Sequence, residues 1–301
     1  MKKNSLLSLV FALIGSVVLA GDTGLAYYKE VKKNFAVNSN VQFKIDLNFA
    51  DCNIQTWDQN TIDIVVKLDV TARNQERADE MFDTYEISIQ EGKEFASLTV
   101  GGGSWGCNSK GKDTESYTVN VEIRIPQKAI LDGSCSFGDL NIGDMQGACM
   151  VEVEYAKLTV NGLWSYENDV KISFGDARIN GTNGGDFRNE YGKLEIKMLQ
   201  GNAEITSSFG DLEIDRVRRE CKDLEIKVEY ADADINLASD AGFRFETRSA
   251  YGDIDLPDAA RKSTVESDYS EKEVRGTIGN GEGKLEVDCD FGDVEIEIVG
   301  D

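Results

Sequence analysis

The sequence of 301 residues contains no histidine and only two prolines. The lack of histidine excludes Ser-His-Asp and Cys-His catalysis, together with the usual zinc sites that use imidazole ligands. Proline cannot donate a backbone hydrogen bond, so its scarcity fits a chain in which most amides must donate, as in an extensive β-sheet. The two absences therefore favour a sheet protein over the familiar histidine-dependent enzymes.

Long apolar runs are also scarce, and the one that is present lies at the N-terminus. Lys2 and Lys3 precede an apolar segment from Leu6 to Leu19. This order predicts a signal peptide over residues 1–20, with a second cleavage position at residue 26. A buried N-terminal strand is the alternative. Because the run is too short for a stable membrane span, we do not expect an integral membrane protein.

The charge and the cleavage site together limit location and partners. No cysteine lies near either cleavage position, so we expect no lipoprotein anchor and a protein exported to the periplasm, the outer surface or the medium. The formal net charge is −23 and becomes −25 once Lys2 and Lys3 are removed. That acidity argues against nucleic acid or an anionic membrane as a partner. It is compatible with divalent cations, a basic partner or simple solubility.

A six-residue phrase recurs through the second half of the chain: an aromatic, Gly or Ala, Asp or Lys, a small or aliphatic residue, any residue, and an aliphatic. A degraded copy begins at Tyr269, and neighbouring copies start 17 to 22 residues apart. A period near 20 residues is typical of a solenoid. The clear copies begin at Phe137, Tyr155, Phe174, Tyr191, Phe209, Tyr230, Tyr251 and Phe291.

The residues around each aromatic, which we number as position 0, predict the shape of one unit. Positions −4 and −2 are mostly apolar or small, so the alternation ends on the aromatic and predicts a strand whose inward face includes the ring. The next inward residues are +3 and +5, as in Leu140 and Ile142. The two residues between, Gly-Asp or Ala-Lys, are predicted to form the bend that absorbs this change of parity. Each unit is therefore a strand, a bend, a short strand and a turn.

Stacking such units at about 4.8 Å would bury the inward faces and pair every strand with its neighbours. The sequence thus predicts an all-β protein folded as a parallel β-helix of about nine coils. An antiparallel sandwich of hairpins is the alternative, but hairpins would alternate the roles of successive strands. Position +2 alternates between Asp and Lys in the early units, which would place opposite charges side by side in a parallel, in-register stack. This column reads Asp139, Lys157, Asp176, Lys193 and Asp211.

Later in the chain the +2 column is purely acidic and raises the question of a metal site. The candidate ligands for Ca²⁺ are Asp211, Asp232 and Asp253, because calcium takes several oxygen ligands. We prefer the interpretation that these are solvated bend residues whose side chains cap local amides. No catalytic residue and no cofactor is predicted.

Six cysteines in an exported chain are compatible with disulfides. Cys135 and Cys289 share one position of the repeat but lie eight repeats apart, too far to bridge in a stack. Most of the cysteines are therefore predicted to be small buried hydrophobes. A disulfide that involves Cys52 or Cys107 stays open.

Residues 28–130 differ from the repeats in 131–301 and are predicted to form a first coil and a capping segment. Asn48–Ile54 resembles a worn copy of the phrase, and Asn74 is positioned to cap a short helix through Tyr85. The final strand, Val294–Val299, is expected to be unpaired, with outward glutamates that discourage end-to-end joining. Further strands of the cap are predicted over Ile62–Val70, Tyr85–Gln90, Phe95–Val100 and Tyr117–Ile125.

Together, the leader, the opening Phe49-Ala-Asp-Cys-Asn-Ile54 followed by Thr56-Trp-Asp58, and the serial coils resemble the exported "putative adhesin" domain proteins of Gram-negative bacteria. The resemblance covers about residues 28–301 and implies a right-handed parallel β-helix. The function of that family is largely unassigned, and no catalytic residues are carried over from it.

Two functions follow as hypotheses. The first is an exported, non-enzymatic adhesin or envelope binding or structural protein whose partner is a surface protein or a glycan. The alternative is a β-helix polysaccharide lyase or glycosidase that acts on an extracellular glycan, which needs clustered acids, often with basic residues and Ca²⁺. The only basic cluster near a coil is Arg216, Arg218 and Arg219, in the long turn Asp215–Asp223.

Overall fold

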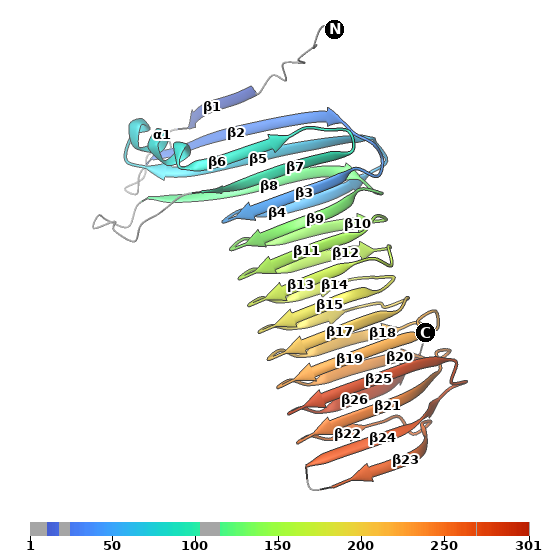
Figure 1. The fold of residues 1–301 in the computed structure, drawn as a ribbon. Coiled ribbons are helices and arrows are strands. Elements are labelled where there is room, and N and C mark those ends of the chain that lie inside the picture. The colour runs from blue at the N-terminus through green and yellow to red at the C-terminus, as the bar shows by residue number, and fades with distance from the viewer. Residues whose placement is uncertain (1–10, 18–24, 103–114, 269, 301) are drawn as a thin grey trace.

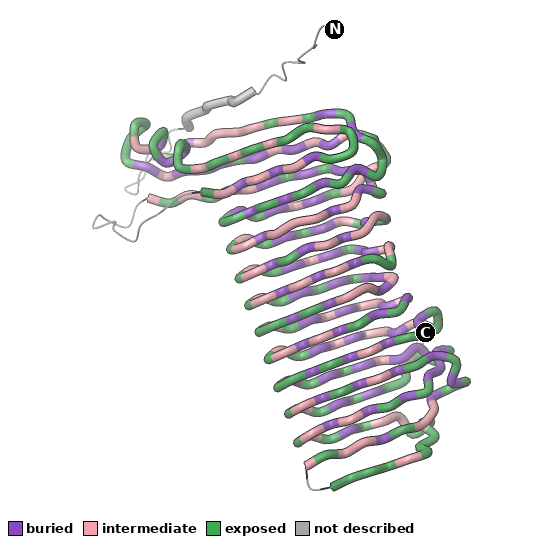
Figure 2. The backbone as a smooth tube through the Cα atoms, viewed as in Figure 1, coloured by how far each residue is buried: buried purple, intermediate pink, exposed green. Residues whose placement is uncertain are grey.

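The structure, a computed structural model, describes residues 11–17, 25–102, 115–268 and 270–300. Within these residues the chain forms one short helix and two sheets of 13 strands each. The sheets face each other along a tall column that widens at its N-terminal end (Figure 1). Buried residues run continuously between them, so the column has one extended core (Figure 2).

Each repeat contributes one strand to each sheet, and equivalent strands of neighbouring coils pair in parallel and in register. Val151 is aligned with Val170, and Ile142 with Val160, as the predicted inward positions require. The predicted parallel stack is therefore confirmed as a solenoid-like, all-β fold, whereas its right-handed sense and its nine coils stay predictions. The strands of one sheet are β9 (Ile130–Ser136), β11 (Cys149–Glu154), β13 (Asp169–Ser173), β15 (Gly185–Glu190), β17 (Ala203–Ser208) and β19 (Asp223–Glu229). Those of the other are β10 (Leu140–Met145), β12 (Leu158–Leu163), β14 (Ala177–Ile179), β16 (Leu194–Ile196), β18 (Leu212–Val217) and β20 (Ala233–Ala238).

The C-terminal coils do not stack in the order of the sequence. Strand β25 (Gly283–Asp290) lies between β19 and β21 (Phe243–Ala250), and β26 (Val294–Val299) lies between β20 and β22 (Ile254–Asp255). The last coil is thus inserted between the two coils that precede it in the sequence. The prediction that Val294–Val299 is an unpaired final strand is wrong, because β26 has a parallel partner on each side.

The degraded copy of the phrase does not form a coil. Strands β23 (Arg261–Ser267) and β24 (Glu271–Ile278) form an antiparallel hairpin, and β24 pairs antiparallel with β21. The physical reason is that β23 has no buried residue with which to continue the inward columns. The hairpin instead covers the C-terminal end of its sheet. Tyr269 itself lies outside the described residues.

The N-terminal segment contains the predicted first coil, helix and strands, but the helix predicted to run through Tyr85 ends at Asp83. Strands β3 (Gln42–Asn48) and β4 (Asp51–Trp57) form the first coil and pair with β9 and β10. Helix α1 (Gln75–Asp83) begins at Asn74, whose side chain accepts a hydrogen bond from the Arg77 N–H at 2.9 Å. The remaining strands are β1 (Phe11–Val17), β2 (Leu25–Ala36), β5 (Thr61–Ala72), β6 (Tyr85–Gln90), β7 (Phe95–Gly102) and β8 (Ser116–Pro126).

Strand β1 falls inside the predicted signal peptide and pairs antiparallel with β2. Cleavage after residue 20 would remove β1 and leave β2 at the edge of its sheet. The signal peptide itself stays a prediction. In the part of the chain that the structure describes, no helix is long and apolar enough to cross a membrane.

The five described cysteines are buried and free of disulfides, as most were predicted to be, and Cys107 lies outside the described residues. The Sγ of Cys135 lies 3.9 Å from the backbone carbonyl oxygen of Ala50, and the Sγ of Cys289 lies 3.6 Å from the backbone carbonyl oxygen of Ala231. The two cysteines occupy the same position of the repeat and therefore make the same contact. Burial raises the pKa of Cys135, Cys149, Cys221 and Cys289 to about 12.

These thiols should resist alkylation in the folded protein and should make it less stable at alkaline pH. In an unfolded chain a thiol ionises near pH 8.5, whereas the folded pKa is about 12, so the folded state binds more protons above that pH. We expect the urea midpoint to fall as the pH rises above about 9. Mass spectrometry after iodoacetamide treatment at pH 8 should show the five buried thiols unmodified without urea and modified with it. Rapid modification without urea would contradict their burial.

Candidate functional site: an exposed aromatic ladder

The aromatic at position 0 of every coil adopts a left-handed backbone conformation. Nine such residues have φ between +52° and +61°, an uncommon state for residues other than glycine. The bend therefore begins at the aromatic, and the side chain leaves the inward face. The prediction that these rings lie in core columns is wrong, because their exposed fractions run from 41% at Phe49 to 66% at Tyr251. A left-handed residue breaks the strand's alternation one position earlier than the sequence pattern indicated.

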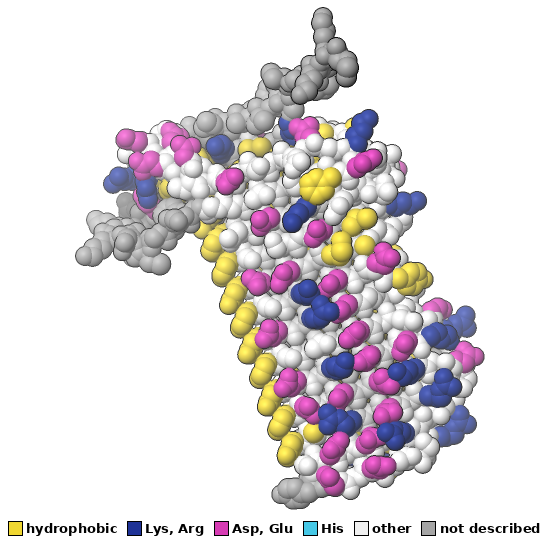
Figure 3. All heavy atoms as spheres, in the orientation of Figure 1, with side chains coloured by type: hydrophobic (Ala, Val, Ile, Leu, Met, Phe, Trp, Pro, Cys, Tyr) yellow, Lys and Arg dark blue, Asp and Glu magenta, His cyan; other side chains and the backbone are white. Residues whose placement is uncertain are grey.

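The nine exposed rings stack on one another in a continuous column, which we call the aromatic ladder. Neighbouring centroids lie 4.7–5.1 Å apart and the ring planes differ by 1–10°. This separation matches the spacing of paired strands, about 4.8 Å, so the backbone stack positions the rings. Figure 3 shows the ladder as a yellow column along one edge of the molecule. In space it reads Phe49, Phe137, Tyr155, Phe174, Tyr191, Phe209, Tyr230, Phe291 and Tyr251.

Stacking offsets the cost of the bend. A left-handed residue with a Cβ costs about 1–2 kcal/mol, and a stacked aromatic pair contributes about 0.5–1.5 kcal/mol beyond the area it buries. Each internal ring covers the faces of two neighbours, so mainly ring edges face the solvent. The result is an apolar strip roughly 39 Å long, given its eight steps of strand spacing.

The small residue at position +1 has a different role from the predicted one. Gly138 and Gly210 do not adopt a positive φ, so the bend does not use their conformational freedom. A Cβ on either residue would instead lie well under 3.0 Å from the +1 carbonyl oxygen of the neighbouring coil. Glycine at these two positions therefore suits the close approach of successive coils, whereas alanine occupies the same position at Ala156 and Ala231.

The acidic residues at position +2 cap the backbone of the next coil. The Asp139 carboxylate accepts the Lys157 N–H at 3.0 Å, and the Asp176 carboxylate accepts the Lys193 N–H at 3.0 Å. The predicted in-register alternation of Asp and Lys at position +2 is thus present, but the Asp carboxylates accept hydrogen bonds from backbone amides. The Lys193 ammonium contacts Glu213, whose hydrogen bond raises the pKa of Lys193.

The three proposed calcium ligands are not consecutive in the stack. Asp211 accepts the Asp232 N–H at 3.2 Å, and Asp232 accepts the Asp293 N–H at 2.9 Å. The inserted coil thus separates Asp232 from Asp253, whose N–H donates to Asp293 at 2.7 Å. These contacts support the amide-capping interpretation, while calcium binding stays a prediction.

Glu195, Glu213 and Asp215 form the one close group of three acidic side chains among the described residues, and the sequence did not indicate it. Lys193 and Lys197 pair with these carboxylates.

In the basic turn, Arg219 pairs with Glu220 at 3.4 Å and with Asp240 at 3.8 Å. Arg216 donates to the carbonyl of Gly300 at 2.6 Å, and Arg218 lies 4.0 Å from Glu220.

The repeats that build the ladder also carry a family signature. The family model described as Toastrack DUF4097 matches residues 131–297. The chain belongs to the Toastrack DUF4097 family. This agrees with the resemblance to "putative adhesin" domain proteins of unassigned function that the repeats predicted. No curated protein matches the chain.

Solved structures similar to this Toastrack chain include three described as putative adhesins. The one from Parabacteroides distasonis is 14% identical, with 90% of this chain and 97% of that chain covered and a TM-score of 0.45. The one from Bacteroides fragilis is 10% identical, with 90% of this chain and 97% of that chain covered and a TM-score of 0.37. The one from Parabacteroides merdae is 13% identical, with 89% of this chain and 95% of that chain covered and a TM-score of 0.31. Similarity at this level extends no activity to the Toastrack chain.

Proposed function

We propose that this Toastrack protein is an exported, non-enzymatic envelope protein that binds a partner through its aromatic ladder. The observation that carries the proposal is the continuous exposed column of nine rings. Contiguous apolar surface of this extent on a soluble domain is typical of an interaction site. Its regular shape and the predicted signal peptide support a binding role at the cell envelope.

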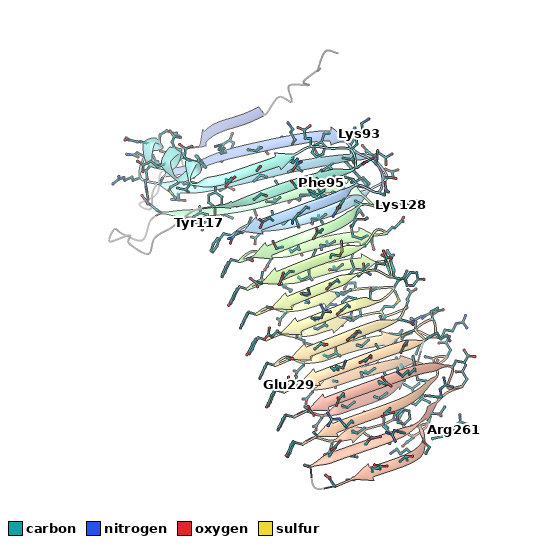
Figure 4. The ribbon with its side chains drawn as sticks, viewed as in Figure 1. Lys93, Phe95, Tyr117, Lys128, Glu229 and Arg261 are labelled. Carbon is teal, nitrogen blue, oxygen red and sulfur yellow. The ribbon has the colours of Figure 1, made fainter. Side chains whose placement is uncertain are left out.

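The ladder favours a protein partner over a glycan. Sugars pack against aromatic faces, and here the faces of all internal rings are covered by neighbouring rings. Exposed aromatic edges suit the apolar centre of a protein interface, which is enriched in aromatic residues. Carboxylates at position −1, such as Glu154, Glu190 and Glu229, directly precede ladder rings in the chain and would form a polar rim. Figure 4 labels Glu229 at this edge of the column.

Replacing three central rings with asparagine should abolish binding while it preserves the bend, because asparagine tolerates the left-handed conformation. The variant combines Tyr155→Asn, Phe174→Asn and Tyr191→Asn. We expect its binding to intact cells of the source organism to fall at least tenfold, with far-UV circular dichroism unchanged. Tyr166→Asn is the matched control, since Tyr166 is 75% exposed and lies outside the ladder.

Two further outcomes decide the rest of the proposal. Trypsin treatment of the cells before the assay should remove binding if the partner is a protein, whereas trypsin-resistant binding would contradict that assignment. Protease added to intact cells should also digest the native protein if it is surface-exposed; full protection would place it in the periplasm. Unchanged binding by the triple variant would refute the role of the ladder.

A further inference from the structure

The two sheets end unevenly at the N-terminal end of the column, and a groove lies where the shorter one stops. Beyond the first coil, one sheet continues through β8, β5, β2 and β1, whereas the other continues through β7 and β6. The groove lies among β2, β5, α1 and β6 and has a volume of about 550 Å³. Pockets that bind small molecules have volumes of about 300–1,000 Å³. The groove is thus large enough for a ligand.

Apolar side chains form one part of the groove wall, and polar groups form the rest. Leu68 of β5 and Phe82 of α1 are buried and belong to the core. Val31 of β2, together with Ile87 and Ile89 of β6, is only partly buried against that core. Covering these side chains with a hydrocarbon chain would stabilise a complex by about 0.8 kcal/mol per buried CH₂ group.

Two lysines line the same groove, although the protein is strongly acidic. Lys29 and Lys33 alternate with Val31 on the face of β2 that carries the buried Tyr27 and Phe35, so they point towards the core side. The Lys33 ammonium lies 2.7 Å from Glu91. Among the described residues, no carboxylate lies within ion-pair distance of the Lys29 ammonium. An inward-facing ammonium beside an apolar wall is matched by a ligand that joins an anion to a hydrocarbon chain.

We infer that this groove binds an anionic amphiphile, specifically a long-chain carboxylate. The carboxylate pairs with the Lys29 ammonium, and the alkyl chain lies along Val31, Ile87 and Ile89. The site lies at the end of the column and is independent of the aromatic ladder. Removal of β1 with the predicted signal peptide would leave β2 at the edge of its sheet, where inward-facing lysines also discourage pairing with other chains. The test must therefore separate ligand binding from that role.

Calorimetric titration of the exported protein with hexadecanoate tests the inference. We expect binding that tightens from octanoate to dodecanoate to hexadecanoate, because each added CH₂ group buries more apolar area. Hexadecanol, which has the same chain and no charge, should bind at least tenfold more weakly. A hydrogen bond to a charged group is worth about 1.5–3 kcal/mol, so Lys29→Gln should weaken hexadecanoate binding about tenfold or more.

Lys32→Gln is the matched control, because Lys32 lies on the same strand, is exposed, and is paired with Glu30 at 2.8 Å. It should bind hexadecanoate as the unmodified protein does. Val31→Trp, which fills the groove from a partly exposed position, should block binding with little change in Tm. Absence of hexadecanoate binding would overturn the inference. Equal affinity for hexadecanol, or equal affinity of Lys29→Gln and Lys32→Gln, would overturn it as well.

Discussion

Replacing Gly210 with valine should destabilise the protein by about 3 kcal/mol or more, a large effect for one exposed bend. A Cβ at Gly210 would lie well under 3.0 Å from three backbone atoms of Gly192 in the neighbouring coil. Gly192 lies in the bend between β15 and β16, so its backbone cannot move aside without disturbing the parallel pairing of both strands. The coils would therefore have to separate locally, which would also break the ring contact between Tyr191 and Phe209.

The measurement is a urea unfolding curve followed by circular dichroism, compared with that of Gly300→Val. Gly300 has no atom within 4 Å of the Cβ that the substitution would add, so the same change should leave the midpoint almost unchanged. Equal midpoints for the two variants would show that coil contact at position +1 does not limit stability. A lower midpoint in Gly210→Val alone would show that coil contact at position +1 does limit stability.

The substitution Ile296→Asp should unfold two coils together. Ile296 is 1% exposed in β26, and a buried, unpaired charge costs about 4 kcal/mol or more. Among the described strands, β21 and β22 pair with the earlier coils only through β25 and β26, so loss of the inserted coil should detach residues 243–255 with it. The coils before residue 238 should stay folded, because each repeat depends mainly on its neighbours.

Hydrogen exchange of Ile296→Asp resolves this outcome by segment. Amides of β21 and β25 should lose protection together, while those of β9 to β17 keep it. Ile298→Asp in the same strand is the control, since Ile298 is 37% exposed and should cost little. If β21 stayed protected while β25 exchanged, the coils would be stacked in the order of the sequence, contrary to the structure.

The repeat made most of the fold predictable. The period near 20 residues, the inward positions −4, −2, +3 and +5, and the capped helix after Asn74 all describe local patterns that the structure keeps. The direction of the rings was not predictable in this way. The alternation of apolar residues shows that the inward-facing positions shift by one somewhere between position 0 and position +3. It does not show which residue adopts the left-handed conformation that causes the shift.

The order of Phe and Tyr along the chain contains a signal for the inserted coil. From Phe137 to Tyr230 the ladder alternates strictly between Phe and Tyr, and sequence order breaks this alternation by placing Tyr251 after Tyr230. In space Phe291 lies between these two tyrosines, and the alternation is restored. Alternation keeps tyrosine hydroxyls two steps apart, so a break in it points to a change in stacking order.

The N-terminal groove could be anticipated only in part. The spacing of Tyr27, Lys29, Val31, Lys33 and Phe35 places lysines and buried rings on one face of a strand. Whether that face is covered depends on how far the opposite sheet extends. That extent is set by long-range pairing, which no local pattern encodes.

The inserted coil also sets an order for folding. Coils up to residue 238 can stack in the order of the sequence, because each adds to the coil before it. Residues 243–255 emerge next, but their native partners in β25 and β26 are made last. A chain that stops early would leave the strand edges of β19 and β20 without their native cover. Completion of the column therefore depends on the last two strands of the chain.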